Sequence, residues 1–240
     1  MADSRAELWV AALGQVPYAE ATALQERLRA ARQAGAIPDS LLLLEHPPVY
    51  TKGRRTDVRA DLPMGESWYL SQGIEVVESD RGGRVTYHGP GQLVGYPIVG
   101  VTDVIEYVRS LEHGVIAALS DEGVKAEVRE GLTGVWVRER KIGSIGVHVS
   151  RGITTHGFAV NVDGDLQPWD YIVPCGIEGV QMTSLYRETI RTGGMTCFRR
   201  RVAWRVAEAL GRRQRIVSLG RLLAAAEAPA TGVPQVVSVT

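Results

Sequence analysis

Cysteine is scarce in this chain of 240 residues, which contains only Cys175 and Cys197. Two cysteines this far apart exclude the dense disulfide framework of a small secreted domain, and they show none of the paired spacings of a zinc site. We therefore expect a protein of a reducing compartment that holds no metal.

The chain also lacks an excess of either charge, because Lys+Arg and Asp+Glu both number 27. A nucleic-acid-binding domain usually carries a strong basic excess, so we expect no nucleic-acid partner. No apolar run approaches the roughly 18 residues of a membrane span, and the first residues lack a basic segment followed by an apolar one. These absences predict a cytoplasmic protein with no signal peptide and no membrane partner.

What the sequence does contain is enough apolar residues, 45%, for a full hydrophobic core. Strand patterns are predicted at residues 7–13, 40–47, 74–78, 84–87, 93–99, 125–129, 134–138, 142–149 and 155–162, and helical spacing at 21–31, 104–119 and 196–210. Residues 54–72 are predicted as a long surface loop. The alternation predicts an α/β fold, a mixed sheet flanked by helices. We expect one domain at 1–225, with a smaller C-terminal part from about residue 185, and a loose tail at 226–240.

Cys175 lies in the stretch YIVPCGI, between Pro174 and Gly176. Proline fixes its own φ, and glycine permits backbone angles that other residues avoid. Together they can hold a bend that exposes the sulfur and turns nearby backbone N–H groups toward one point, as an oxyanion site beside a nucleophile requires. The same pattern fits a small buried apolar residue, which is how most free cysteines occur. Cys197, in a helical pattern beside Phe198, is interpreted in that second way.

A cysteine nucleophile needs a base or a cation nearby, and the candidates are histidine and lysine. Of five histidines, His88 and His156 each precede a glycine and are the best placed to line a pocket. Lys141 is one of only three lysines and opens the apolar stretch KIGSIGV. A buried lysine can serve as a base or as the counter-ion of a thiolate. From the neighbouring charged RERK turn alone, a solvated Lys141 is the favoured interpretation.

A glycine-rich stretch, RGGRVTYHGPGQLVGYP, runs from Arg81 to Pro97. It matches neither the GxxxxGK[ST] phosphate loop nor a dinucleotide loop, which opens a helix. Its glycines are expected to let the backbone approach an extended ligand closely. Arg81 and Arg84, with Arg54 and Arg55, are candidates for a basic patch that binds phosphate or an acidic partner. A tight hairpin with solvated arginines is the alternative.

Five motifs follow one another in a specific order: LLLLEHPPVYTKGRR, DRGGRVTYHGPGQLVGYPI, RKIGSIGV, THGFAVNV and IVPCGI…MTSL. As a set they resemble the bacterial-type lipoyl/octanoyl transferases of lipoate biosynthesis, over about Leu8 to Leu210. The resemblance implies a mixed sheet with helices around it, like the catalytic domains of biotin and lipoate protein ligases. It implies transfer of an octanoyl group from the phosphopantetheine of acyl carrier protein to a lysine. The acceptors would be lipoyl domains of 2-oxoacid dehydrogenases and the glycine cleavage H protein, with no ATP and no metal.

The resemblance also assigns residues. It places the catalytic cysteine on Cys175 and the catalytic lysine on Lys141. Beside these, we expect His156 and Gly176 to support the site, with His88 and His156 forming hydrogen bonds in it. It places the substrate-binding residues on Arg81, Gly82, Gly83, Arg84, Val85, Thr86, Tyr87, His88, Ser144, Ile145, Gly146, Gly157, Phe158 and Ala159. Gly143 departs from the alanine that the family often has two residues after the lysine, and we expect it to loosen the acyl-binding wall.

The mechanism that this implies is acyl transfer in two steps through a thioester on Cys175. Lys141 would move the protons, and backbone N–H groups near Gly176 and in the glycine-rich stretch would stabilise the oxyanion. Ile142, Ile145, Phe158 and Ala159 are expected to line an acyl channel. Because each buried CH₂ contributes roughly 0.8 kcal/mol, such a channel can read chain length. Arg54, Arg55 and Arg81 are candidates for contact with the acidic carrier protein.

Three other functions stay open at this stage. An ATP-dependent lipoate or biotin ligase of the same fold would not need Cys175. A binding module would hold the carrier or the acyl group without turnover. An unrelated thiol hydrolase would pair Cys175 with His88 or His156 instead of Lys141.

Overall fold

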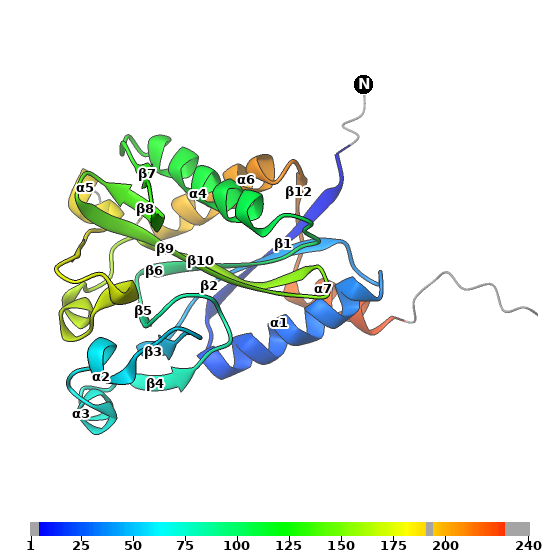
Figure 1. Ribbon diagram of the computed structural model, residues 1–240. Helices are drawn as coiled ribbons and strands as arrows, with labels where there is room; N and C mark the ends of the chain where they lie inside the picture. The colour runs from blue at the N-terminus through cyan, green and yellow to red at the C-terminus, as the bar shows by residue number, and fades with distance from the viewer. Residues whose placement is uncertain (1–4, 191–193, 229–240) are drawn as a thin grey trace, which may run out of the picture.

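A mixed nine-stranded sheet forms the centre of this computed structural model, which describes residues 5–190 and 194–228 (Figure 1). Along the sheet the strands run β12 (Arg213–Ile216), β1 (Glu7–Gln15), β2 (Asp39–Glu45), β6 (Gln92–Ile98), β10 (Ile153–Asn161), β9 (Arg140–Ser150), β8 (Leu132–Val137) and β7 (Glu127–Arg129), with β11 (Gln181–Met182) beside β9. The pairs β12–β1, β1–β2 and β11–β9 are parallel and the others antiparallel. The predicted mixed sheet is confirmed.

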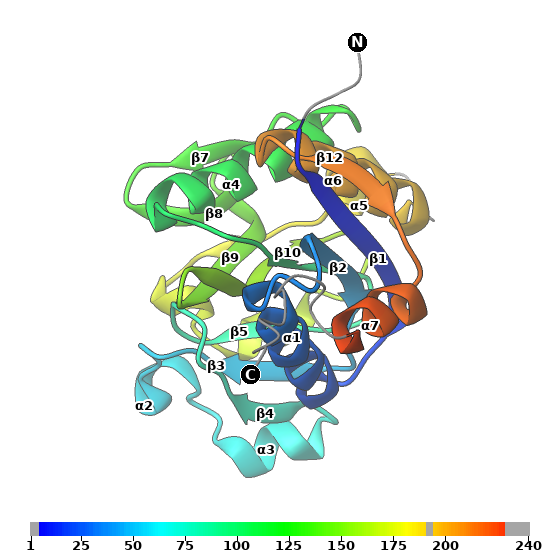
Figure 2. The ribbon, with the colours of Figure 1, turned by 90° about the vertical axis from the view of Figure 1, so that its right-hand side faces the viewer.

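Helices cover both faces of this sheet (Figures 1 and 2). α4 (Val104–Ser120) and α6 (Met195–Ala209) pack on one face, and α1 (Tyr18–Gln33) and α7 (Leu219–Glu227) pack on the other. The apolar run in β2 serves both faces: Leu41 and Leu43 join the core under α4, while Leu42 and Leu44 join the core under α1. A strand buried on both faces reads as a continuous apolar run, so this prediction was correct.

A smaller three-stranded sheet stands beside the main one. It contains β4 (Glu75–Glu78), β3 (Val49–Lys52) and β5 (Thr86–His88), in that order. Its core is aromatic, with the rings of Tyr50 and Tyr69 at 4.9 Å and those of Tyr50 and Tyr87 at 5.5 Å between centroids. The glycine-rich stretch contains β5 and most of β6, so it connects this small sheet to the main one.

The prediction of a long surface loop at residues 54–72 was wrong. The segment contains α2 (Val58–Asp61) and α3 (Glu66–Ser71), two helices too short to show a helical period. The Asp57 carboxylate caps α2 by accepting hydrogen bonds from the N–H groups of Arg59 and Ala60. Tyr69 is fully buried, and its hydroxyl donates to the carbonyl of Tyr171 at 2.8 Å. The segment is therefore tied to the region that precedes Cys175.

Several other details differ from expectation, most of them in the C-terminal third. β12, α5 (Leu185–Thr189) and α7 are present where no element was predicted. In the predicted helices, Val104 is 43% exposed instead of buried, and Cys197 is exposed on α6 because the buried face of that helix passes through Phe198 and Val202. The domain boundaries at 1–225 and about 185 stay a prediction, and most of the predicted tail at 226–240 lies outside the described residues. None of the described helices is both long and apolar enough to cross a membrane.

Candidate active site

Cys175 sits in a tight turn, η2 (Pro174–Gly176), that follows the 3-10 helix η1 (Gln167–Tyr171). Its φ of 57° is left-handed, a conformation that costs energy for a residue with a side chain. The turn is held because the Cys175 N–H donates to the Val85 carbonyl at 3.0 Å. Gly176, at φ 71°, is required as glycine, since a Cβ there would meet Arg84 Cδ at 2.3 Å. The predicted bend is therefore present and leaves Cys175 partly exposed in a pocket.

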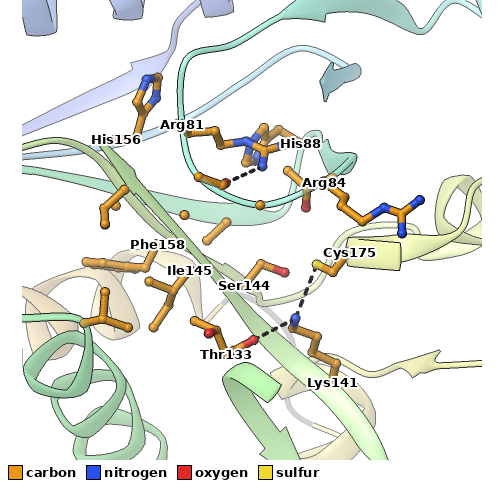
Figure 3. Close-up of a pocket in the computed structure, with 18 of the residues that line it drawn as sticks. Arg81, Arg84, His88, Thr133, Lys141, Ser144, Ile145, His156, Phe158 and Cys175 are labelled. Carbon is orange, nitrogen blue, oxygen red and sulfur yellow. Dashed lines mark hydrogen bonds between the residues drawn. The ribbon is translucent and has the colours of Figure 1, made fainter. Parts of the chain in front are cut away.

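Lys141 reaches Cys175 from β9 across 34 positions of sequence. Its Nζ lies 3.3 Å from Cys175 Sγ and donates to the Thr133 carbonyl at 3.0 Å (Figure 3). Lys141 is only 1% exposed, so the interpretation of a solvated lysine was wrong. Its aliphatic chain passes over Gly134, where a Cβ would meet Lys141 Cε at 2.6 Å. The structure thus brings together a thiol and a desolvated amine.

An ion pair between a half-buried arginine and a buried carboxylate secures the turn on its other side. Arg84 Nε donates to the Asp61 carboxylate at 2.9 Å, and Asp61 is fully buried. The Asp61 backbone carbonyl in turn accepts the Val173 N–H at 3.0 Å. The end of α2 is therefore joined both to the glycine-rich stretch and to the residues that lead into Cys175. Neither Asp61 nor this role of Arg84 was predicted from the sequence.

A cavity of about 300 Å³ opens beside the sulfur. Most predicted substrate-binding residues line it: Arg81, Gly82, Gly83, Arg84, Thr86, His88, Ser144, Ile145, Gly146, Gly157, Phe158 and Ala159, together with His156. Val85 and Tyr87 do not line it, which corrects the prediction. Side chains alternate along β5, so Thr86 and His88 face the cavity while Val85 and Tyr87 enter the aromatic core of the small sheet.

Two further expectations about the cavity wall were wrong. Ile142 is fully buried in the core under α4 and does not line the cavity. Gly143 does not line it either, because a Cβ there would point at Val135 of β8, 3.2 Å from its Cβ. The absence of a methyl group at Gly143 therefore does not loosen the acyl-binding wall.

Sequence reasoning missed several residues of the cavity: Tyr18, Val94, Tyr96, Val108, Leu132, Thr133 and Ile177. Tyr18 and Val108 come from α1 and α4, and no local motif marks them. Tyr96 and Val94 lie inside the glycine-rich motif and could have been found by taking every second residue of β6. Ile145, Val108 and Phe158 make one side of the cavity apolar.

His88 and His156 line the cavity together with Tyr18 and Tyr96, and His46 packs behind them against the rings of Tyr18 and His88. Burial lowers the pKa of His46 to about 4, lowers that of His88 well below its ordinary range, and also lowers that of His156. His88 Nδ1 donates to Gln92 Oε1 at 2.7 Å, and His156 Nε2 donates to Asp80 Oδ1 at 2.6 Å. No hydrogen bond joins a histidine to Cys175 anywhere in the described chain. The pairing of a cysteine with a histidine therefore lacks support here.

Arg81 does not lie on the surface. It is 7% exposed, and its guanidinium donates to the side-chain and backbone oxygens of Thr51 at 2.6 to 3.0 Å. Burial lowers the pKa of Arg81. Contact between Arg81 and a carrier protein is therefore excluded by burial, whereas Arg54 and Arg55 are exposed. Arg81 instead supplies a buried positive charge to the cavity wall.

The N–H groups around Cys175 already have partners. Those of Cys175, Gly176 and Ile177 donate to the carbonyls of Val85, Val173 and Pro174, respectively, at 3.0 to 3.1 Å. The prediction of an oxyanion site at the Gly176 turn is therefore wrong, because these N–H groups already form hydrogen bonds to backbone carbonyls. By contrast, the hydroxyl groups of Thr86 and Ser144 are buried without a hydrogen-bond partner in the described structure, and both residues line the cavity.

In the described part of the chain, no group of three or more His, Cys, Asp or Glu side chains is arranged to hold a metal ion.

The architecture is similar to that of solved protein ligases, and this similarity defines the fold class of the protein. A bi-partite lipoate protein ligase from Thermoplasma acidophilum superposes with a TM-score of 0.70 at 17% identity, covering 92% of this chain and 90% of that one. A biotin protein ligase from Aquifex aeolicus superposes with a TM-score of 0.51 at 13% identity, covering 84% and 68%. The protein therefore has the fold of the lipoate and biotin protein ligases.

The sequence comparisons narrow this class. The family described as the lipoyl protein ligase A/B catalytic domain matches residues 17–205. An octanoyltransferase from Rubrobacter xylanophilus is 49% identical over 82% of this chain and 91% of its own length. One from Acidobacterium capsulatum is 46% identical over 77% and 81%. The chain belongs to this family, among the octanoyltransferases, and the predicted acyltransferase of lipoate biosynthesis is confirmed at that level.

Proposed function

We propose that the protein moves an octanoyl group from acyl carrier protein to a lysine of a lipoyl domain or of the glycine cleavage H protein, through a thioester on Cys175. The observation that carries the proposal is the 3.3 Å contact between Lys141 Nζ and Cys175 Sγ at the wall of an acyl-sized cavity. A ligase that activates its substrate with ATP needs no thiol there, whereas acyl exchange between thioesters does.

The first step transfers the acyl group to the enzyme. Lys141 takes the Cys175 proton, and the thiolate attacks the carbonyl carbon of the carrier thioester. The C–S bond to phosphopantetheine then breaks, and its thiolate leaves with the proton that Lys141 returns. One thioester replaces another, so the step is nearly balanced in free energy.

We assign the oxyanion of this step to hydroxyl donors. Ser144 lies beside Cys175 in the cavity with its oxygen directed to that side (Figure 3). Its hydroxyl is buried and has no hydrogen-bond partner among the described residues, and the same holds for that of Thr86. A buried unpaired hydroxyl costs free energy in the empty site, and it recovers a hydrogen bond when negative charge develops on a substrate oxygen.

The second step forms the amide. The neutral amine of the acceptor lysine attacks the acyl-enzyme carbonyl, Lys141 takes a proton from it, and the Cys175 thiolate leaves. Amide formation from a thioester is downhill, so the reaction needs no ATP and no metal. The apolar side of the cavity, with Ile145, Val108 and Phe158, binds the octanoyl chain.

The exposed Arg54 and Arg55 are the proposed contacts for the acidic carrier protein, since Arg55 also lines the cavity. Carrier binding through these residues would weaken as salt is raised, because exposed charges are screened.

A transfer assay tests the function. Purified protein is mixed with octanoyl carrier protein and an isolated lipoyl domain, without nucleotide, and octanoylation of the domain is followed by mass. We expect transfer without ATP. Transfer that occurs only with ATP and free octanoate would instead identify a ligase, and carrier binding with no transfer would identify a binding module.

A further inference from the structure

Glu112 is a charged side chain that the reaction described above does not use. It lies on α4, is 0% exposed and is not part of the cavity wall. Its Oε2 accepts a hydrogen bond from Arg109 at 2.6 Å, and its Oε1 accepts one from the Gly134 N–H at 2.9 Å. Burying a carboxylate is costly, so a buried one that is fully hydrogen-bonded calls for a structural or functional reason.

The partner of Glu112 is the peptide group that also binds Lys141. The Gly134 N–H and the Thr133 carbonyl belong to one planar peptide. Its N–H donates to Glu112, and its carbonyl accepts from Lys141 Nζ at 3.0 Å. One peptide therefore links the Glu112 carboxylate to the amine that contacts Cys175 (Figure 3 shows the Thr133, Lys141 and Cys175 end of this chain).

This peptide needs an external support. Gly134 has a φ of 127°, outside ordinary strand geometry, and the pairing of β8 with β9 shifts register just after it. Its N–H donates to a side chain of α4 in place of a neighbouring strand. Without a hydrogen-bond acceptor at position 112, we expect the Thr133–Gly134 peptide to rotate and the Thr133 carbonyl to turn away from Lys141.

We propose that Glu112 is a positioning residue for Lys141, acting through the Thr133–Gly134 peptide; this rests on the proposed function of Lys141 at Cys175. A charged acceptor makes a stronger hydrogen bond than a neutral one, and it polarises the peptide so that its carbonyl becomes a better acceptor. Glu112 thus fixes the direction of the Lys141 amine toward the Cys175 sulfur.

Alkylation of Cys175 by iodoacetamide tests this without any acyl substrate. The background is Cys197→Ser, which removes the second, exposed thiol. Because hydrogen bonds to charged groups are among the stronger ones, Glu112→Leu should slow alkylation by about ten- to a hundredfold. Leu111→Ala is the matched control, since Leu111 is buried on the same helix and its apolar side chain has no hydrogen-bonding atom to hold the peptide. It should alkylate at the parent rate in the folded protein, checked by circular dichroism.

The decisive comparison is a double-mutant cycle with Lys141→Met. If Glu112 acts through Lys141, Glu112→Leu slows alkylation in the parent and not further in the Lys141→Met background. Glu112→Gln, which keeps an oxygen acceptor, should react faster than Glu112→Leu. Three results would each overturn the proposal. Glu112→Leu could slow alkylation equally in the parent and the Lys141→Met backgrounds, Leu111→Ala could slow alkylation as much as Glu112→Leu does, or folded Glu112→Leu could react at the parent rate. Failure of octanoyl transfer by the wild type would overturn the proposed function alone, because alkylation needs no octanoyl donor.

Discussion

The buried histidines beside the cavity make the folded protein sensitive to mild acid, and His46, which packs against His88, gives the clearest case. His46 is 0% exposed; its Nδ1–H donates to the Val16 carbonyl at 2.6 Å, so its Nε2 accepts from the Tyr96 hydroxyl at 2.7 Å. Both ring nitrogens are therefore satisfied in the neutral form. Burial lowers the pKa of His46 from 6.5 to about 4.

The free-energy change follows from proton linkage. At pH values between the folded and the unfolded pKa of His46, the unfolded chain binds a proton that the folded protein does not. The contribution of neutral His46 to the free energy of unfolding is therefore fully present above the unfolded pKa and is lost as the pH falls toward the folded pKa. Each pKa unit corresponds to about 1.36 kcal/mol, and His46 alone should therefore cost about 2 kcal/mol of unfolding free energy between about pH 7.5 and about pH 5.

Urea denaturation at these two pH values, for the wild type and His46→Gln, measures the effect. Glutamine is neutral at both pH values, so His46→Gln should lose about 2 kcal/mol less on acidification than the wild type. His113→Gln, at an exposed position of α4, is the control and should behave as the wild type does. An acid-induced loss in His46→Gln equal to that of the wild type would refute the argument that His46 is buried in its neutral form.

Three further substitutions test the active-site geometry. Gly134→Ala would place a Cβ 2.6 Å from Lys141 Cε, so we expect acylation of Cys175 to slow by about 100-fold in a rapid-quench assay. Acylation at the wild-type rate would contradict the placement of Lys141. Ser144→Ala should slow acylation by about 100-fold and leave thiol alkylation unchanged, and equal loss in both assays would argue against an oxyanion donor. Gly176→Ala, with a Cβ 2.3 Å from Arg84 Cδ, should lower Tm and destabilise the fold by about 1–3 kcal/mol; calorimetry showing an unchanged Tm would contradict the tight turn.

Elements with a strong local pattern could be predicted from the sequence. The leucines of β2 point alternately into the two cores, and the apolar residues of α1 lie on the one face of the helix that packs on the sheet. Both patterns are visible in the local sequence. The short α2 and α3 have no period to detect, and they exist because of the Asp57 cap and the burial of Tyr69. Their prediction needed tertiary contacts.

The active site was less accessible to local reasoning. The bend at Cys175 follows from its flanking proline and glycine, but the N–H groups of that bend are used by backbone carbonyls that no local pattern reveals. Lys141 looked solvated from its charged neighbours, and its burial depends on β8 and on the space left by Gly134. Its assignment came from the resemblance to octanoyltransferases. Glu112 gave no signal, because a single acidic residue in a helix is ordinary.

The most direct test of the central claim is the intact mass of the protein after brief incubation with octanoyl carrier protein, followed by peptide mapping. We expect one octanoyl group, attached to Cys175 and removable by hydroxylamine. It should be absent in Cys175→Ser and form far more slowly in Lys141→Met. An adduct that persists in Cys175→Ser, or octanoyl transfer to the lipoyl domain by that variant at the wild-type rate, would contradict it.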